Sequence, residues 1–142
     1  MNQRLLLLVC LAGFAIGCMP IRAPIAAVTT PVVQGSPNGE RLLEITINDS
    51  KVDPTKYLCL ELQIRPTAGE ASTTQRISTT ASSTSKWACD WLDDSTIVLN
   101  SRDIGFRAWQ VGQDGSVTKL PLPLTGPQQE FAKEILAKKY GS

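Results

Sequence analysis

A nine-residue alternation at Tyr57–Arg65 constrains the fold of this 142-residue chain more than any other feature. Successive side chains of a β-strand point to opposite faces of the sheet, so a period of two predicts a strand with one apolar face. That face is expected to carry Leu58, Leu60, Leu62 and Ile64. Cys59 is expected to point to the opposite side of the same strand. The apolar face needs a covering layer, which a second element of the domain must supply.

Further strands are expected on both sides of this segment. Arg41–Asn48 alternates in the same way, and Ser95–Leu99 reads as a short buried strand. Gly105–Val111 and Val117–Leu120 flank an Asp-Gly pair, which is typical of a hairpin. In Trp87–Trp91, an extended backbone would place two tryptophans and Cys89 on one face.

Residues 71–85 allow two interpretations. Ten of these fifteen residues are Ser or Thr. The serine content favours a long exposed connection, whereas the threonines favour a polar edge strand around Gln75–Thr80. The sequence alone leaves this choice open.

The chain is expected to end in a helix at Gln128–Tyr140. Thr125 and Gln128 fit a capping box, and Gly141 supplies a stop. An apolar stripe along the helix is expected to pack on the Leu58–Ile64 face. The predicted fold is therefore α+β, with a small, mostly antiparallel sheet and a C-terminal amphipathic helix on one face.

The N-terminus carries a different kind of signal. Arg4 precedes a twelve-residue apolar stretch at Leu5–Ile16, and small residues lead to Gly17-Cys18. The stretch is too short to span a bilayer, for which about 20 residues are needed, but it has the length of a signal-peptide core. The run Ala15-Ile16-Gly17-Cys18 resembles the cleavage site of bacterial lipoproteins. An ordinary secretory signal and a short uncleaved anchor are the alternatives.

The resemblance implies a lipid on Cys18, loss of residues 1–17, and attachment to the membrane through the lipid. Met19 stands where an Asp would favour the inner membrane, so the implied location is the outer membrane, facing the periplasm. The proline-containing residues 18–38 would form an extended tether, and 39–142 the folded domain. The alternative is a first strand within Ile25–Val33.

The same resemblance implies a disulfide. If Cys10 is removed and Cys18 is lipidated, Cys59 and Cys89 are the two cysteines left, and an exported protein would join them. Two free buried thiols are the alternative. Because Cys59 points away from the leucines, the bond would lie on the far side of the sheet from the apolar core.

Catalytic motifs are scarce. The chain has no histidine, so Ser-His-Asp and Cys-His sites are excluded. Asp90, Asp93 and Asp94 form an acidic cluster that could hydrolyse cell-wall sugars, although turn and strand-entry roles are the expected ones. We expect neither a cofactor nor a metal, because two cysteines without histidine cannot complete a zinc site.

A short polar segment at Arg102-Asp103, set between apolar stretches, suggests a contact surface. Arg102, Asp103 and Trp109 are candidate partner-binding residues. Without residues 1–17 the chain loses one of its 14 basic groups and then balances its 13 acidic ones, which excludes a typical nucleic-acid binder. The prediction is a non-catalytic interaction or scaffold module with an envelope protein as partner. An immunity or inhibitor lipoprotein acting against a periplasmic toxin or lysozyme, and a cell-wall hydrolase, are the alternatives.

Overall fold

The computed structural model describes residues 31–69 and 73–141, so the predictions for Cys18 and the signal peptide lie outside the described residues. Within these ranges the chain forms eight strands and then one helix. The elements are β1 (Val32–Gly35), β2 (Arg41–Ile47), β3 (Cys59–Pro66), β4 (Gln75–Ser82), β5 (Trp87–Trp91), β6 (Thr96–Ser101), β7 (Gly105–Val111), β8 (Val117–Lys119) and α1 (Gly126–Tyr140). In this part of the chain, no helix has the length and apolar character needed to cross a membrane.

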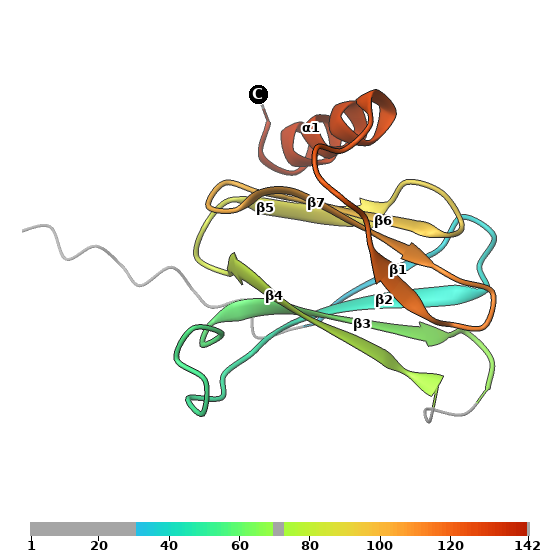
Figure 1. The fold of residues 1–142 in the computed structure, drawn as a ribbon, viewed down its shortest axis with the longest axis horizontal. Helices are drawn as coiled ribbons and strands as arrows, with labels where there is room; N and C mark the ends of the chain where they lie inside the picture. The colour runs from blue at the N-terminus through green and yellow to red at the C-terminus, as the bar shows by residue number, and fades with distance from the viewer. Residues whose placement is uncertain (1–30, 70–72, 142) are drawn as a thin grey trace, which may run out of the picture.

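The strands form two antiparallel sheets of four, each in chain order, and the sheets lie face to face with α1 on the outer side of the second (Figure 1). The predicted α+β class is confirmed. The prediction of a single sheet is wrong. Local patterns identify strands but not their partners, and the chain passes from the first sheet to the second between β4 and β5.

The two sheets bury a common apolar core. The first sheet contributes Leu43, Ile45, Leu60, Leu62, Ile64 and Ala81, and the second contributes Trp87, Cys89, Trp91, Ile97, Leu99, Trp109 and Val111. The predicted apolar face of β3 is thus confirmed from Leu60 onward. Leu58 does not belong to it, because its φ of 58° is left-handed and the strand begins only at Cys59.

The helix packs on the other face of the second sheet. Val98, Ala108, Leu124 and Ala132 form this smaller apolar cluster, and Asn100 Nδ2 donates to the carbonyl oxygen of Ala132 at 2.8 Å. The predicted packing against the β3 leucines is wrong, because the second sheet already covers them. The expected capping contact is present: the backbone N–H of Thr125 donates to Gln128 Oε1 at 3.0 Å.

Both open questions about the strands are settled by the sheet pairing. Residues 75–82 form the edge strand β4, which pairs with β3. β1 pairs with β2 from Val32 to Gly35, so the folded domain begins before the predicted boundary at Gly39.

Candidate functional site

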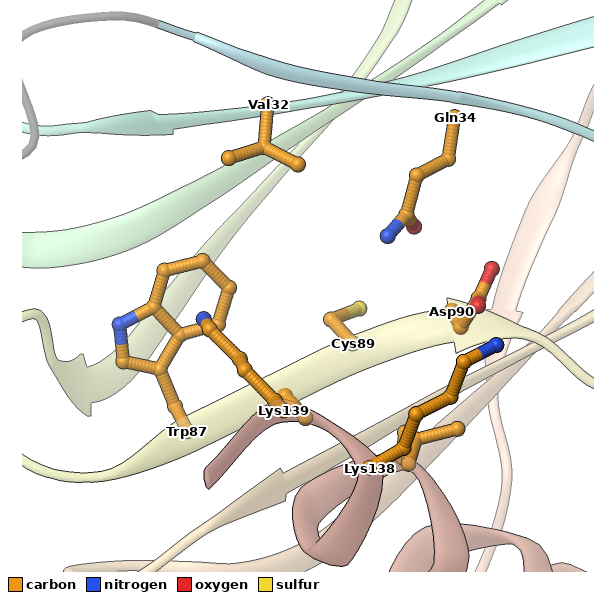
Figure 2. Close-up of a pocket in the computed structure, with 9 residues that line it drawn as sticks. Val32, Gln34, Trp87, Cys89, Asp90, Lys138 and Lys139 are labelled. Atoms are coloured by element: carbon orange, nitrogen blue, oxygen red, sulfur yellow. The ribbon is translucent and has the colours of Figure 1, made fainter. Parts of the chain in front are cut away.

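A cleft of about 370 Å³ lies where the edge strands β1 and β5 meet the C-terminal end of α1 (Figure 2). Each of the three elements supplies part of its wall. We call it the β1/β5 cleft; its lining is Val32, Gln34, Trp87, Ala88, Cys89, Asp90, Ile135, Lys138 and Lys139. With two lysines and one aspartate, the lining carries a net positive charge.

A glutamine supplies the cleft with an unused hydrogen-bond acceptor. Gln34 follows Val32 on the same face of β1, and Figure 2 shows its amide directed toward β5. Gln34 Oε1 is buried and has no hydrogen-bond partner. A buried acceptor without a partner costs about 1–3 kcal/mol, so a ligand that donates to it would recover that free energy.

One of the two lysines of the cleft, Lys139, lies against an aromatic ring. Lys139 Nζ is 3.2 Å from the centre of the Trp87 ring, and Tyr140 Oη accepts from the backbone N–H of Trp87 at 3.2 Å. Burial lowers the pKa of Lys139. No ion pair between described residues involves Lys86, Lys138 or Lys139. Their charges are therefore available to an anionic ligand.

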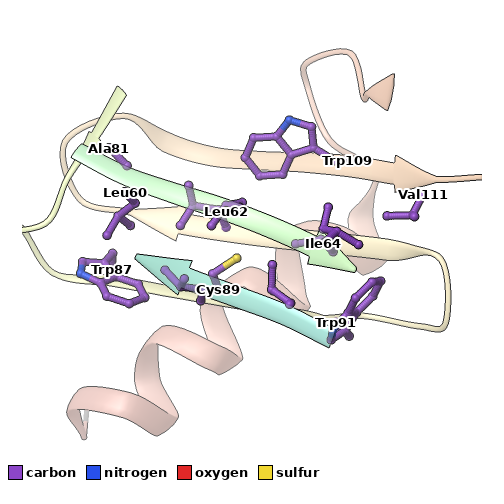
Figure 3. Close-up of a cluster of buried hydrophobic side chains, with 13 residues drawn as sticks. Leu60, Leu62, Ile64, Ala81, Trp87, Cys89, Trp91, Trp109 and Val111 are labelled. Carbon is purple, nitrogen blue, oxygen red and sulfur yellow. The ribbon is translucent and has the colours of Figure 1, made fainter. Parts of the chain in front are cut away.

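The predicted disulfide between Cys59 and Cys89 is wrong, because both cysteines are free. Cys89 lies between the two sheets among the leucines (Figure 3). Cys59 is on the other face of β3, where its Sγ donates to the carbonyl oxygen of Thr55 at 3.5 Å. The prediction that Trp87, Cys89 and Trp91 share a face is confirmed, but that face is turned toward the β3 leucines. The body of the first sheet therefore separates the two sulfurs.

Both thiols are held in their protonated form. Burial raises the pKa of Cys89, and the neighbouring Asp90 carboxylate raises it further. Burial also raises the pKa of Cys59. Since the thiolate is the reactive species, neither cysteine is activated as a nucleophile.

The acidic cluster is divided among separate roles. Asp93 Oδ1 accepts from the backbone N–H of Ser95 at 2.8 Å, and Asp94 Oδ1 accepts from the backbone N–H of Asn38 at 2.7 Å. The contact of Asp93 is the predicted turn role, whereas Asp94 instead links its loop to the distant β1–β2 turn. Asp90 alone of the three lines the cleft. No group of three His, Cys, Asp or Glu side chains within residues 31–69 and 73–141 could hold a metal ion.

The three candidate partner-binding residues do not form one surface. Trp109 is only 5% exposed and belongs to the core, so it is not an accessible aromatic. Asp103 joins the sheets: its Oδ2 accepts from the backbone N–H of Ser82 at 2.7 Å, and its Oδ1 accepts a short hydrogen bond from Ser101 Oγ. Burial opposes its ionisation, but the hydrogen bonds from Ser101 and Ser82 outweigh burial and lower the pKa of Asp103. Arg102 is exposed beside it.

The sequence analysis missed the residues that form the cleft. Gln34 fell within the predicted tether, and Lys138 and Lys139 read as the solvated face of the helix. One signal was present. Once Val32 is placed in a strand, Gln34 must share its face, and a glutamine at a core-facing position indicates a polar requirement there.

No family model, curated protein or solved structure gives a significant match to the chain.

Proposed function

We propose that the protein is a lipid-anchored component of the bacterial envelope that acts as a non-catalytic interaction or scaffold module, with the β1/β5 cleft as its contact site. The anchor part of the proposal depends on the lipoprotein-like run Ala15–Cys18. On this view the lipid would hold the domain at the outer membrane, facing the periplasm. The cleft would then receive a neighbouring envelope protein.

The observation that best supports the cleft as the contact site is the buried, unpaired acceptor Gln34 Oε1. Buried polar atoms in folded proteins are nearly always hydrogen-bonded, so an orphaned acceptor at the wall of a cleft indicates that a partner completes it. The unpaired lysines beside it add charge to the same place.

The chemistry of the lining supports binding over catalysis. Its thiol is held protonated by burial, and it offers a single carboxylate, Asp90. Hydrolysis of a glycosidic bond needs two carboxyl groups facing one cleft, about 5–9.5 Å apart. Asp93 and Asp94 do not line this cleft, since they bind backbone amides in turns.

Two experiments in the native bacterium test the proposal. Labelling with radioactive palmitate should mark the wild-type protein, and Cys18→Ser should lose the label. A photo-crosslinking amino acid at position 138, in the cleft, should give a discrete protein adduct. The same amino acid at position 51, in the exposed β2–β3 connection, is the control. Equal adducts at both positions, or none at position 138, would contradict the contact site.

A further inference from the structure

The backbone of β5 offers the cleft a second set of hydrogen-bonding groups. The N–H of Arg102 donates to the carbonyl oxygen of Lys86 at 2.9 Å, and the N–H of Leu92 donates to the carbonyl oxygen of Thr96 at 2.8 Å. Hydrogen-bonded pairs alternate along an antiparallel ladder. Even-numbered residues of β5 therefore bond to β6, and the backbone groups of Trp87, Cys89 and Trp91 point to the open edge.

The backbone N–H groups at the two ends of this edge are hydrogen-bonded within the chain, and the one at its centre is not. The N–H of Trp87 donates to Tyr140 Oη at 3.2 Å, and the N–H of Trp91 donates to Asp90 Oδ1 at 2.8 Å. Between them, the N–H of Cys89 has no acceptor in the described part of the chain. Cys89 is also part of the cleft lining, so this amide is offered to the cleft.

The cleft thus combines three complementary features. It has a free backbone N–H at Cys89, an unpaired acceptor at Gln34 Oε1, and two ammonium groups, those of Lys138 and Lys139, without an ion-pair partner among the described residues. A peptide backbone supplies a carbonyl oxygen for the first and an N–H for the second, as in strand addition to an open sheet edge. A carboxylate side chain complements the lysines.

We infer that the β1/β5 cleft binds an extended, acidic peptide segment of a partner protein, which adds to the open edge of β5 at Cys89 and places a carboxylate between Lys138 and Lys139. This inference rests on the proposed function and specifies the partner. Trp87 N–H and Trp91 N–H, already bonded within the chain, limit the pairing to a short segment. The contact is thereby confined to the centre of the strand.

A five-residue probe peptide, acetyl-TVEVT-amide, tests this with the full chain purified in detergent. Its matched peptides carry Gln in place of Glu, or an N-methyl group on the central residue. We expect the Glu peptide to bind about tenfold more tightly than either, because each loses one charge-assisted or backbone hydrogen bond. In ¹H–¹⁵N NMR spectra the Cys89 amide should shift on titration.

Two variants locate the effect. Lys138→Ala should reduce the preference for Glu over Gln several-fold, whereas Lys133→Ala, a matched change where the lysine pairs with Glu130, should leave it unchanged. Equal binding of the three peptides, or a Cys89 amide that does not move, would overturn the inference. Since crosslinking at position 138 is independent of these probes, a protein adduct there combined with peptide failure would reject the peptide mode alone.

Discussion

The strands β3 and β6 are both inner strands of their sheets, yet they are buried differently. Leu60, Leu62 and Ile64 of β3 are buried, while the side chains between them are partly exposed. All six residues of β6 are buried. The first sheet covers the core with one face only, whereas the second lies between the core and α1 (Figure 1).

The difference shows how one chain builds a three-layer domain from two similar meanders. In β3 the apolar residues alternate with polar ones, but in β6 they run continuously as Ile97-Val98-Leu99. A continuous apolar run gives a strand two apolar faces, and each needs its own cover. The helix supplies the second cover, and its C-terminal end then becomes a wall of the β1/β5 cleft.

The largest expected effect comes from a polar substitution on the helix-facing side of β6. Val98→Asn should lower the free energy of unfolding by about 3–5 kcal/mol, because it loses apolar burial and buries an amide without partners. Gln63→Asn, on the outer face of β3, should cost about 1 kcal/mol or less. Urea unfolding measures both. Equal costs would remove the contrast between the two sheets.

The docking of the helix gives a smaller effect. Asn100→Ala removes the hydrogen bond from Asn100 Nδ2 to Ala132 O and should cost about 1–2 kcal/mol. Amide exchange in α1 should accelerate more than exchange in β2 and β3. If exchange rises uniformly through the chain, the bond does not act on the docking of the helix.

The link at Asp103 should make part of the stability depend on pH. Asp103→Asn should cost about 1 kcal/mol at pH 7, a modest value because the side chain is exposed. Since hydrogen bonds lower the folded pKa of Asp103, its contribution is complete above the unfolded value of about 3.9 and is lost as the pH falls through the lower folded value. The difference in unfolding free energy between wild type and variant should be constant from about pH 7 to 5 and shrink below about pH 4. A difference that does not shrink as the pH falls below about 4 would contradict this role.

The smallest expected effect is that of a reducing agent. Cys59 and Cys89 are free, and the first sheet separates the outward-facing Cys59 from Cys89 in the core. Dithiothreitol should therefore change the unfolding free energy by less than about 0.5 kcal/mol. A disulfide would instead contribute about 2–4 kcal/mol. Mass spectrometry after alkylation of the unfolded, unreduced protein should find both thiols modified. Recovery of the Cys59 and Cys89 peptides linked to each other would show that the disulfide exists and would contradict this account.

Sequence patterns predicted local structure well and the arrangement poorly. The alternation in β2 and β3, the Asp-Gly hairpin and the capped helix were all identifiable, because each depends on neighbouring residues. The pairing of strands and the layer on which α1 docks depend on distant contacts. The β6 run Ile97–Leu99 did contain the missing information, since a strand with two apolar faces cannot lie at the surface.

The candidate site was less predictable still, because its residues come from opposite ends of the domain. Gln34 and Lys138 are brought together only when β1 lies beside β5 and α1 docks on the second sheet. The predicted disulfide placed Cys89 on the side of the sheet that faces away from the apolar core, and this was wrong. Cys89 faces the core, and the open edge that it shares with the cleft follows from the hydrogen-bond ladder rather than from the side-chain pattern.

Residue-resolved amide hydrogen exchange in β5 tests the central claim most directly. Ala88 and Asp90 bond to β6, whereas the N–H of Cys89 faces the cleft at the open edge. We expect the amides of Ala88 and Asp90 to exchange slowly and that of Cys89 to exchange much faster, although all three lie in one strand. Equal protection of the three amides would mean that the edge is closed, and it would contradict the cleft as a binding site.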